Sequence, residues 1–317
     1  MNRRKRIAIL GPLPPTRSGI ARHTAASAKA LAQHADVKVW SFLRQYPTWL
    51  YPGDAEEADD LRVFGELDEA RMVVGTNVIS WYRAIRDIED WQPDLVVFPV
   101  WTFFLAPAIG TIVRALRRRG CETCAIVHNA FDHEERGWKR RFSLYALGAG
   151  DRYVTHGATL ASQIKSHFKD AEVVVFPHPI FDDFPQAKQS LKPRAALELL
   201  FFGLVRPYKG LDIAIEALAR SERTDIQLTV AGEFWQGLSE TQAQIDRLGV
   251  AQQIEVIPRY ISDAETAELF DRADAVLLPY RSVMGSGVVS MSFFCNRPVI
   301  VSDLPGINEL VQEFNAG

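Results

Sequence analysis

The chain has 317 residues, of which 47% are hydrophobic and 24% are charged, and its formal net charge is -3. This length allows two domains of ordinary size, and the composition is typical of a globular protein. The small negative charge gives no support to nucleic-acid binding, and no apolar run of about 18 residues predicts a membrane span. The start, MNRRKRIAIL, lacks the long apolar core of a signal peptide and indicates a first strand.

Short apolar runs alternate with amphipathic helical stretches, which favours parallel α/β sheets. Strands are predicted in the first half at 6–10, 36–42, 94–100, 124–129, 152–157 and 172–178, with helices at 19–34 and before Gly120. Residues 179–196 contain three prolines and no periodicity, which is typical of a linker. The alternation restarts with strands at 197–203, 226–232, 253–258, 275–280 and 298–303, and helices up to about 220 and at 239–248, 263–272 and 287–296.

This pattern predicts two Rossmann-like domains, residues 1–185 and 190–317, that face each other across a cleft. Open parallel sheets bind ligands beyond the carboxyl ends of their strands, so the βα loops are expected to line that cleft. The three cysteines, Cys121, Cys124 and Cys295, cannot all pair, and a reduced cytoplasmic setting is the simplest fit. The Cys121-x-x-Cys124 pair has no partner pair, so we interpret it as structural.

Two loops place small residues immediately before a helix. GPLPPTRSGIARHT (11–24) is not a dinucleotide fingerprint, but Ser18 and Gly19 precede a helix whose free N–H groups attract anions. Ser286, Gly287 and Val288 form a second such start. The alternative for each loop is an ordinary turn, with Ser18 acting only as a helix cap.

A third loop carries two cations between a buried strand and a helix. In LLFFGLVRPYKGLDIAIEAL (199–218), Gly203 is followed by Arg206, Lys209 and Gly210. An arginine fork and a lysine point charge suit phosphate oxygens, so this loop predicts a phosphate cradle. The alternative is that both cations are simply solvated.

His128 and Asn129 fall where a strand meets a loop, so they are expected to face the cleft. His128 is either a catalytic or substrate-binding residue or a hydrogen-bonded structural one. The following His133, Glu134 and Glu135 do not form HExxH, and no second ligand cluster is recognisable, so no metal is predicted.

Together these loops resemble the GT-B glycosyltransferases of the GT4 type (glycosyl transferases group 1) over residues 6–317. GPLPPTRSGIARHT is similar to G-x-x-P-P-x-x-S-G-I-A-x-x-T, and FFGLVRPYKGLD to F-x-G-x-x-x-x-x-K-G-x-D. VAGE matches V-x-G-E, and PVIVSDLPGINE resembles P-V-I-x-x-x-x-G-G-x-x-E.

The resemblance implies a retaining, metal-independent transfer of a hexose from a nucleoside-diphosphate sugar to a glycan or lipid-linked acceptor in polysaccharide biosynthesis, without a cofactor. It implies catalytic roles for Arg206 and Lys209, which bind the donor diphosphate, and for His128 beside the transferred sugar. The implied diphosphate-binding set is Ser18, Gly19, Gly203, Arg206, Lys209, Ser286, Gly287 and Val288. The acceptor belongs to the N-terminal domain and the donor to the C-terminal one. The alternatives are a GT-B nucleotide-sugar epimerase and a catalytically silent nucleotide-sugar-binding or partner subunit.

Two departures from the family pattern favour the silent subunit. Val283 and Met291 stand where many members have the glutamates of an E-x7-E motif, and we assign no replacement for the ribose contact. The chain also stops at FNAG, before a further strand and helices of the family, so the C-terminal domain is expected to be incomplete.

Basic clusters at 3–6, 117–119 and 139–141 lie in the expected acceptor domain. With the aromatic residues Trp101, Phe103, Phe104 and Trp138, they suggest peripheral contact with the inner face of a membrane. The alternative is solvated helix ends and core aromatics.

Overall fold

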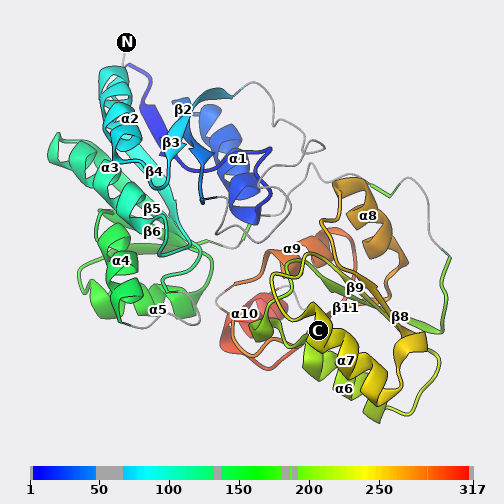
Figure 1. The fold of residues 1–317 in the computed structure, drawn as a ribbon. Coiled ribbons are helices and arrows are strands. Elements are labelled where there is room, and N and C mark those ends of the chain that lie inside the picture. Colours follow the sequence, from blue (N-terminus) through cyan, green and yellow to red (C-terminus); the bar gives the residue numbers. More distant parts are fainter. Residues whose placement is uncertain are drawn as a thin grey trace. The chain divides into compact units, whose positions relative to one another are not determined.

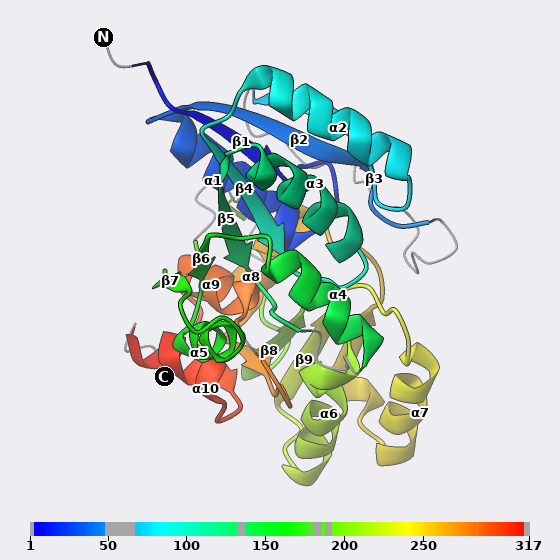
Figure 2. The same cartoon turned by 90° about the vertical axis from the view of Figure 1, so that its left-hand side faces the viewer.

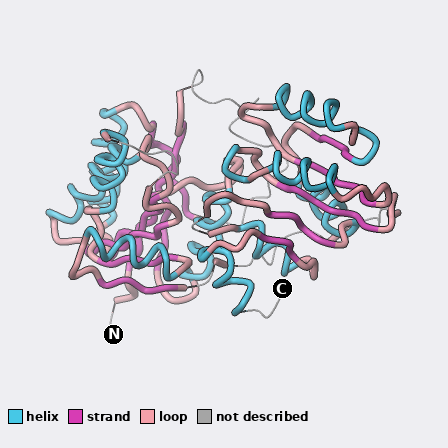
Figure 3. The backbone as a smooth tube through the Cα atoms, turned by 90° about the horizontal axis from the view of Figure 1, so that it is seen from below, coloured by secondary structure: helices cyan, strands magenta, loops and turns pink. Residues whose placement is uncertain are grey.

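The computed structural model describes residues 3–47, 67–131, 137–176, 178–179, 186–187, 192–283 and 285–313. It contains two compact units, an N-terminal unit, Met1–Pro179, and a C-terminal unit, Ile180–Gly317. Within each unit the paired strands are parallel and form one sheet that helices cover on both faces (Figure 1). Figure 3 shows the strands of each unit gathered into a layer beside its helices.

The N-terminal unit has a seven-stranded sheet with the order β3-β2-β1-β4-β5-β6-β7. Its strands are β1 (Arg6–Leu10), β2 (Asp36–Arg44), β3 (Asp68–Val74), β4 (Leu95–Val100), β5 (Glu122–Val127), β6 (Arg152–Thr155) and β7 (Glu172–Val175). Its helices are α1 (Gly19–Ala32), α2 (Val78–Trp91), α3 (Ala106–Arg118), α4 (Trp138–Leu147) and α5 (Ala158–His167).

Helices α2, α3 and α4 lie side by side on one face of this sheet, and α1 lies on the other (Figures 1 and 2). Apolar side chains at helical spacing decide which side of α3 is buried, because Ile109, Ile112, Val113 and Leu116 recur every three or four residues. On the opposite face, Ala25 and Ala28 of α1 pack against the sheet core. Their small side chains let α1 approach the strands closely.

The C-terminal unit has a five-stranded sheet with the order β10-β9-β8-β11-β12. Its strands are β8 (Leu197–Phe202), β9 (Ile226–Ala231), β10 (Ile254–Ile257), β11 (Ala275–Leu278) and β12 (Val299–Val301). Its α-helices are α6 (Leu211–Arg220), α7 (Leu238–Leu248), α8 (Asp263–Arg272), α9 (Gly287–Phe294) and α10 (Pro305–Glu313), and its single-turn 3-10 helices are η1 (Pro207–Lys209) and η2 (Ala251–Gln253).

Each face of this second sheet has its own hydrophobic core. Leu211 and Ile215 of α6 and Ile245 of α7 belong to one cluster, which covers one face. Phe270 of α8 and Val289 of α9 belong to the other. The sheet is therefore buried on both sides, which explains why its strands are continuous apolar runs rather than alternating ones.

The strand order reverses between β1 and β4 in the first sheet and between β8 and β11 in the second. At such a reversal the loops after the two neighbouring strands leave in opposite directions and open a crevice for a ligand. In the C-terminal unit these are the loops that contain Gly203 and Ser286. The fold therefore brings together two loops that the sequence analysis selected separately.

Every strand that the sequence predicts is present, with small shifts at the ends. The prediction missed β3 and α2 and did not name α4, α5 or α10. β3 is an edge strand in which Asp68, Glu69 and Arg71 obscure the alternation. Residues 133–135 and most of the predicted linker fall outside the residues that the structure describes. No helix in the described ranges is long and apolar enough to cross a bilayer.

Candidate active site

The loop after β8 brings Gly203 and Lys209 into contact. Gly203 has φ +93, and a Cβ built on it would lie 3.1 Å from Nζ of Lys209. Lys209 is only 7% exposed, and its Nζ donates a hydrogen bond to the Phe202 carbonyl oxygen at 3.4 Å. A side chain at position 203 would crowd the ammonium group, so the absence of one keeps this side of Lys209 accessible.

Within the described residues, the cations of this loop have no acidic partner. Neither Arg206 nor Lys209 forms an ion pair with a carboxylate in the described part of the chain. The Arg206 guanidinium lies 5.0 Å from the ring centre of Trp235, and the Lys209 Nζ lies 5.7 Å from that of Tyr280. Burial, and secondly the charge of Arg206, lower the pKa of Lys209 to about 8. A buried ammonium group without a counter-ion is unfavourable, and a bound anion would relieve that cost.

The N-terminus of α9 lies beside the same ammonium group. The Val288 side chain is 3.8 Å from the Cβ position of Gly203. Ser286 is buried in extended conformation before Gly287 and makes no side-chain cap hydrogen bond. The first N–H groups of an α-helix have no partner within the helix and carry a partial positive charge. The predicted residues Gly203, Lys209 and Val288 thus form one group around a positively polarised surface.

An arginine that the sequence analysis did not select holds this loop in place. Arg281 forms a two-pronged ion pair with Asp212, at 2.8 and 2.5 Å. It also donates to the Pro207 carbonyl oxygen at 2.9 Å through its guanidinium group and to the Tyr208 carbonyl oxygen at 2.7 Å through its backbone N–H. The hydrogen bond from Arg281 lowers the pKa of Asp212. The aspartate of the K-G-x-D segment was the one signal in the sequence for this brace.

The start of α1 in the N-terminal unit has both features that the sequence suggested, a capping serine and open space beside the following glycine. The Ser18 hydroxyl accepts a hydrogen bond from the Ala21 N–H at 3.0 Å, so Ser18 is a helix cap. A Cβ added at Gly19 would meet nothing within 4 Å. The first turn of α1 is therefore unobstructed there, and its role towards a diphosphate stays a prediction.

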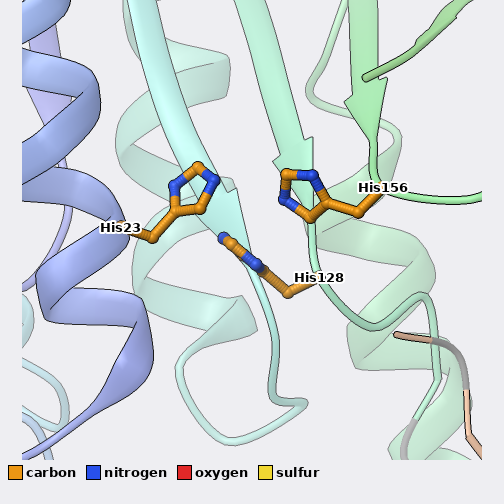
Figure 4. A group of neighbouring side chains, drawn as sticks. All are labelled: His23, His128 and His156. Atoms are coloured by element: carbon orange, nitrogen blue, oxygen red, sulfur yellow. The ribbon is translucent and has the colours of Figure 1, made fainter. Parts of the chain in front are cut away.

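His128 lies directly after β5 and belongs to a cluster of four histidines. Its ring centre is 4.5 Å from that of His23, 5.1 Å from that of His156 and 6.4 Å from that of His178. Figure 4 shows the rings of His23, His128 and His156 turned towards one another. Burial lowers the pKa of His23 to about 3 and that of His178 to about 4, and it holds the pKa of His128 well below its usual value. Burial therefore disfavours the charged form of these histidines.

The two residues that replace the glutamates of the family pattern lie against the hydrophobic core. Val283 and Met291, at the places of the two glutamates, pack against the core of the C-terminal unit. All three cysteines are free, and burial raises the pKa of Cys124 to about 11, which makes its thiol unreactive.

Comparison with known proteins gives a family match for the C-terminal unit and a fold match for the chain. Residues 196–317 match the family of glycosyl transferases group 1. The GDP-mannose:glycolipid 4-beta-D-mannosyltransferase of Xanthomonas campestris pv. campestris is 25% identical over 194 residues, which are 60% of this chain and 52% of that protein. The chain thus spans about half the length of this relative.

Two solved structures have the same fold. Sucrose-phosphate synthase from Thermosynechococcus elongatus superposes with a TM-score of 0.72 at 13% identity, covering 97% of this chain and 84% of that one. Anabaena HepE in complex with UDP and glucose has a TM-score of 0.65 at 14% identity, covering 97% and 83%. The fold is that of the GT-B glycosyltransferases. The match to the glycosyl transferases group 1 family covers residues 196–317, which lie in the C-terminal unit.

The turn that ends the cationic loop yields a stability test. Gly210 has φ +69, and a Cβ there would lie 2.0 Å from the Pro279 carbonyl oxygen, whereas Gly249 has φ +70 and open space. Left-handed backbone costs a non-glycine residue about 1–2 kcal/mol. We expect Gly249→Ala to lower the free energy of unfolding by about that amount, and Gly210→Ala to lower it further because of the backbone clash. Urea unfolding followed by circular dichroism measures both, and equal losses would contradict the packing described.

Proposed function

We propose that this protein is a retaining, metal-independent glycosyltransferase of the GT4 type, which transfers a hexose from a nucleoside-diphosphate sugar. The observation that carries the proposal is the pair Arg206 and Lys209, two cations without a described acidic partner beside the start of α9. Cleavage of the bond between the sugar and the diphosphate leaves negative charge on the diphosphate. Where no metal ion neutralises it, cationic side chains and helix N-termini take that role.

The proposed reaction needs no cofactor. The bond between the sugar C1 and the diphosphate oxygen breaks, and its electron pair stays with the diphosphate, held by Arg206 and Lys209. The acceptor oxygen bonds to C1 from the same face, and its proton passes to a phosphate oxygen of the departing group. No protein group is therefore assigned as general base. The roles of Ser18 and Gly19 at the diphosphate and of His128 near the sugar stay predictions from the family resemblance.

The substrates are proposed by class. The Xanthomonas relative is named for GDP-mannose and a glycolipid, and the HepE structure contains UDP and glucose. These names support a nucleotide sugar as donor and a glycan or lipid-linked acceptor, as in polysaccharide assembly. Because one name contains GDP and the other UDP, the nucleobase of the donor has to be determined by experiment.

The two alternatives are weaker. An epimerase requires acid–base groups whose pKa values lie near the working pH. Burial instead lowers the pKa values of the clustered histidines, to about 3 for His23 and about 4 for His178. A silent subunit agrees with Val283 and Met291 in place of the glutamates, and only a turnover measurement separates it from the enzyme.

Nucleotide binding tests the proposed cradle. We expect one of UDP, GDP, ADP or CMP to raise the melting temperature of the wild-type chain. Lys209→Ala and Arg206→Ala should each lower the affinity for that nucleotide by about 10- to 100-fold, since hydrogen bonds to charged groups contribute about 1.5–3 kcal/mol. Arg223→Ala removes an exposed arginine of the same unit, paired with Asp225 at 2.7 Å, and should bind like wild type.

Transfer or hydrolysis of the matching nucleotide sugar completes the test. Activity that disappears in Lys209→Ala supports the enzyme. Nucleotide binding without turnover of any sugar donor identifies the silent subunit, and no shift with any of the four nucleotides would remove the basis for the cradle.

A second proposal is that α4 makes peripheral contact with an anionic membrane. Its buried side, Ser143, Ala146 and Leu147, leaves Trp138 60% and Phe142 40% exposed. Lys139, Arg140 and Arg141 precede Phe142 and form no ion pair with a described carboxylate. The other basic clusters are partly neutralised, since Arg117 pairs with Asp151 at 2.7 Å and Arg3 with Asp94 at 2.9 Å. Of the three clusters, 139–141 is therefore the best suited to anionic lipid.

Vesicle sedimentation tests this surface, defined as Trp138, residues 139–141 and Phe142. Each cation near an anionic surface contributes about 1 kcal/mol, so replacing residues 139–141 with glutamine should weaken binding to phosphatidylglycerol vesicles by about 100-fold. Binding should fall as salt rises and be weak on phosphatidylcholine. The control exchanges Arg220 and Arg223, two exposed arginines of the C-terminal unit. An equal effect of the control would contradict the proposal.

A further inference from the structure

Four of the seven histidines of the chain meet at one place in the N-terminal unit. His128 and His156 directly follow the adjacent strands β5 and β6, and His178 comes soon after β7. His23 reaches the same place from α1 (Figure 4). These positions are far apart in the sequence, and only the parallel order of the strands brings them together. For that reason the histidine cluster is not recognisable in the sequence, where no second ligand cluster was found.

The geometry of three of these histidines is that of metal ligands. His23, His128 and His156 each offer a ring nitrogen, and these nitrogens lie within 4.8 Å of one another. Tetrahedral zinc with bonds of about 2.0–2.1 Å places its nitrogens about 3.3–3.4 Å apart, so small ring rotations would close the site. Neighbouring His178 has its ring centre 4.9 Å from that of His156.

The Nδ1 atoms of His156 and His23, called the outer nitrogens here, already have partners in the protein. Nδ1 of His156 pairs with the Phe176 carbonyl oxygen at 3.0 Å, which requires a proton on Nδ1 and leaves a lone pair on Nε2. Nδ1 of His23 lies 3.3 Å from the Ser27 hydroxyl. Metal-binding histidines commonly have such a partner on the second nitrogen, which fixes the ring and the tautomer.

Two inner nitrogens, the Nε2 atoms of His128 and His156, lack hydrogen-bond partners in the described residues. Nε2 of His128 and Nε2 of His156 are both buried and make no hydrogen bond within the described residues. His23 is 4% exposed and His156 9%. Buried polar atoms are nearly always satisfied, and an unsatisfied one costs about 1–3 kcal/mol. Two such atoms in one cluster therefore call for an occupant.

We propose that His23, His128 and His156 bind one zinc ion, with a solvent molecule or an anion in the fourth position. Imidazole nitrogen is a preferred zinc ligand, and three neutral histidines with an open position form a known kind of zinc site. The ion lies in the N-terminal unit and is not assigned to the donor diphosphate, so the inference does not rest on the proposed transferase reaction.

Zinc binding is measured on the full chain, without an affinity tag and after removal of metal by a chelator. Titration calorimetry with Zn²⁺ alone should show one site per chain. His23→Ala and His156→Ala should each weaken it by more than about 100-fold, because even outer-sphere partners are worth 10- to 100-fold in affinity. His34→Ala and His167→Ala, which remove exposed histidines of the same unit, should leave it unchanged.

Two further measurements guard against misfolding and adventitious binding. His156→Gln keeps a polar side chain of similar length and should remain folded by circular dichroism while losing the site. Co²⁺ should give the visible absorption of tetrahedral coordination in the wild type and not in His156→Gln. Absence of a saturable site in the wild type, or unchanged zinc affinity in the folded His23 and His156 variants, would overturn the proposal.

Discussion

The burial of the Lys209 ammonium group, with no acidic partner among the described residues, is the constraint on which the C-terminal unit depends. Its Nζ donates a hydrogen bond to the Phe202 carbonyl oxygen at 3.4 Å, and burial, with the charge of Arg206 as a second cause, lowers its pKa to about 8. The loop resists this repulsion because Gly210 turns it tightly against β11 and Arg281 anchors it through Asp212. The protein thus maintains an electrostatically unfavourable arrangement, which is reasonable where an anion is to be bound.

The sequence was a good guide to the strands, because strands of a sheet covered on both faces are short continuous apolar runs. It also identified Gly203 and Lys209, since both fall in one short loop between a strand and a helix. It missed Arg281, whose contact with Asp212 in the first turn of α6 joins positions that are 69 residues apart in the sequence. The histidine cluster was hidden for the same reason, because contacts between distant positions follow from strand order rather than from local pattern.

The two units present opposite chemistry at the carboxyl ends of their strands. The C-terminal unit gathers positive charge, from Arg206, Lys209 and the start of α9, which suits a diphosphate. The N-terminal unit gathers imidazoles, and the Nε2 atoms of His128 and His156 are buried without hydrogen-bond partners in the described residues, which suits a metal ion. We therefore propose a different kind of ligand for each of the two Rossmann-like units, and the side chains at the strand ends decide which. The match of residues 196–317 to the glycosyl transferases group 1 family agrees with the cationic site.

The most direct test of this account is the pH dependence of nucleoside diphosphate binding, measured by titration calorimetry between about pH 7 and 9.5. Burial holds the pKa of Lys209 at about 8 in the free protein, so the charged form is present below that pH and is lost above it. The account predicts that affinity decreases as pH rises through about 8, by up to tenfold per pH unit, because each unit removes nine-tenths of the remaining charged form. Lys209→Met should bind weakly at all pH values without this decrease. An equal decrease in Lys209→Met, or unchanged wild-type affinity up to about pH 9.5, would contradict the central role of Lys209.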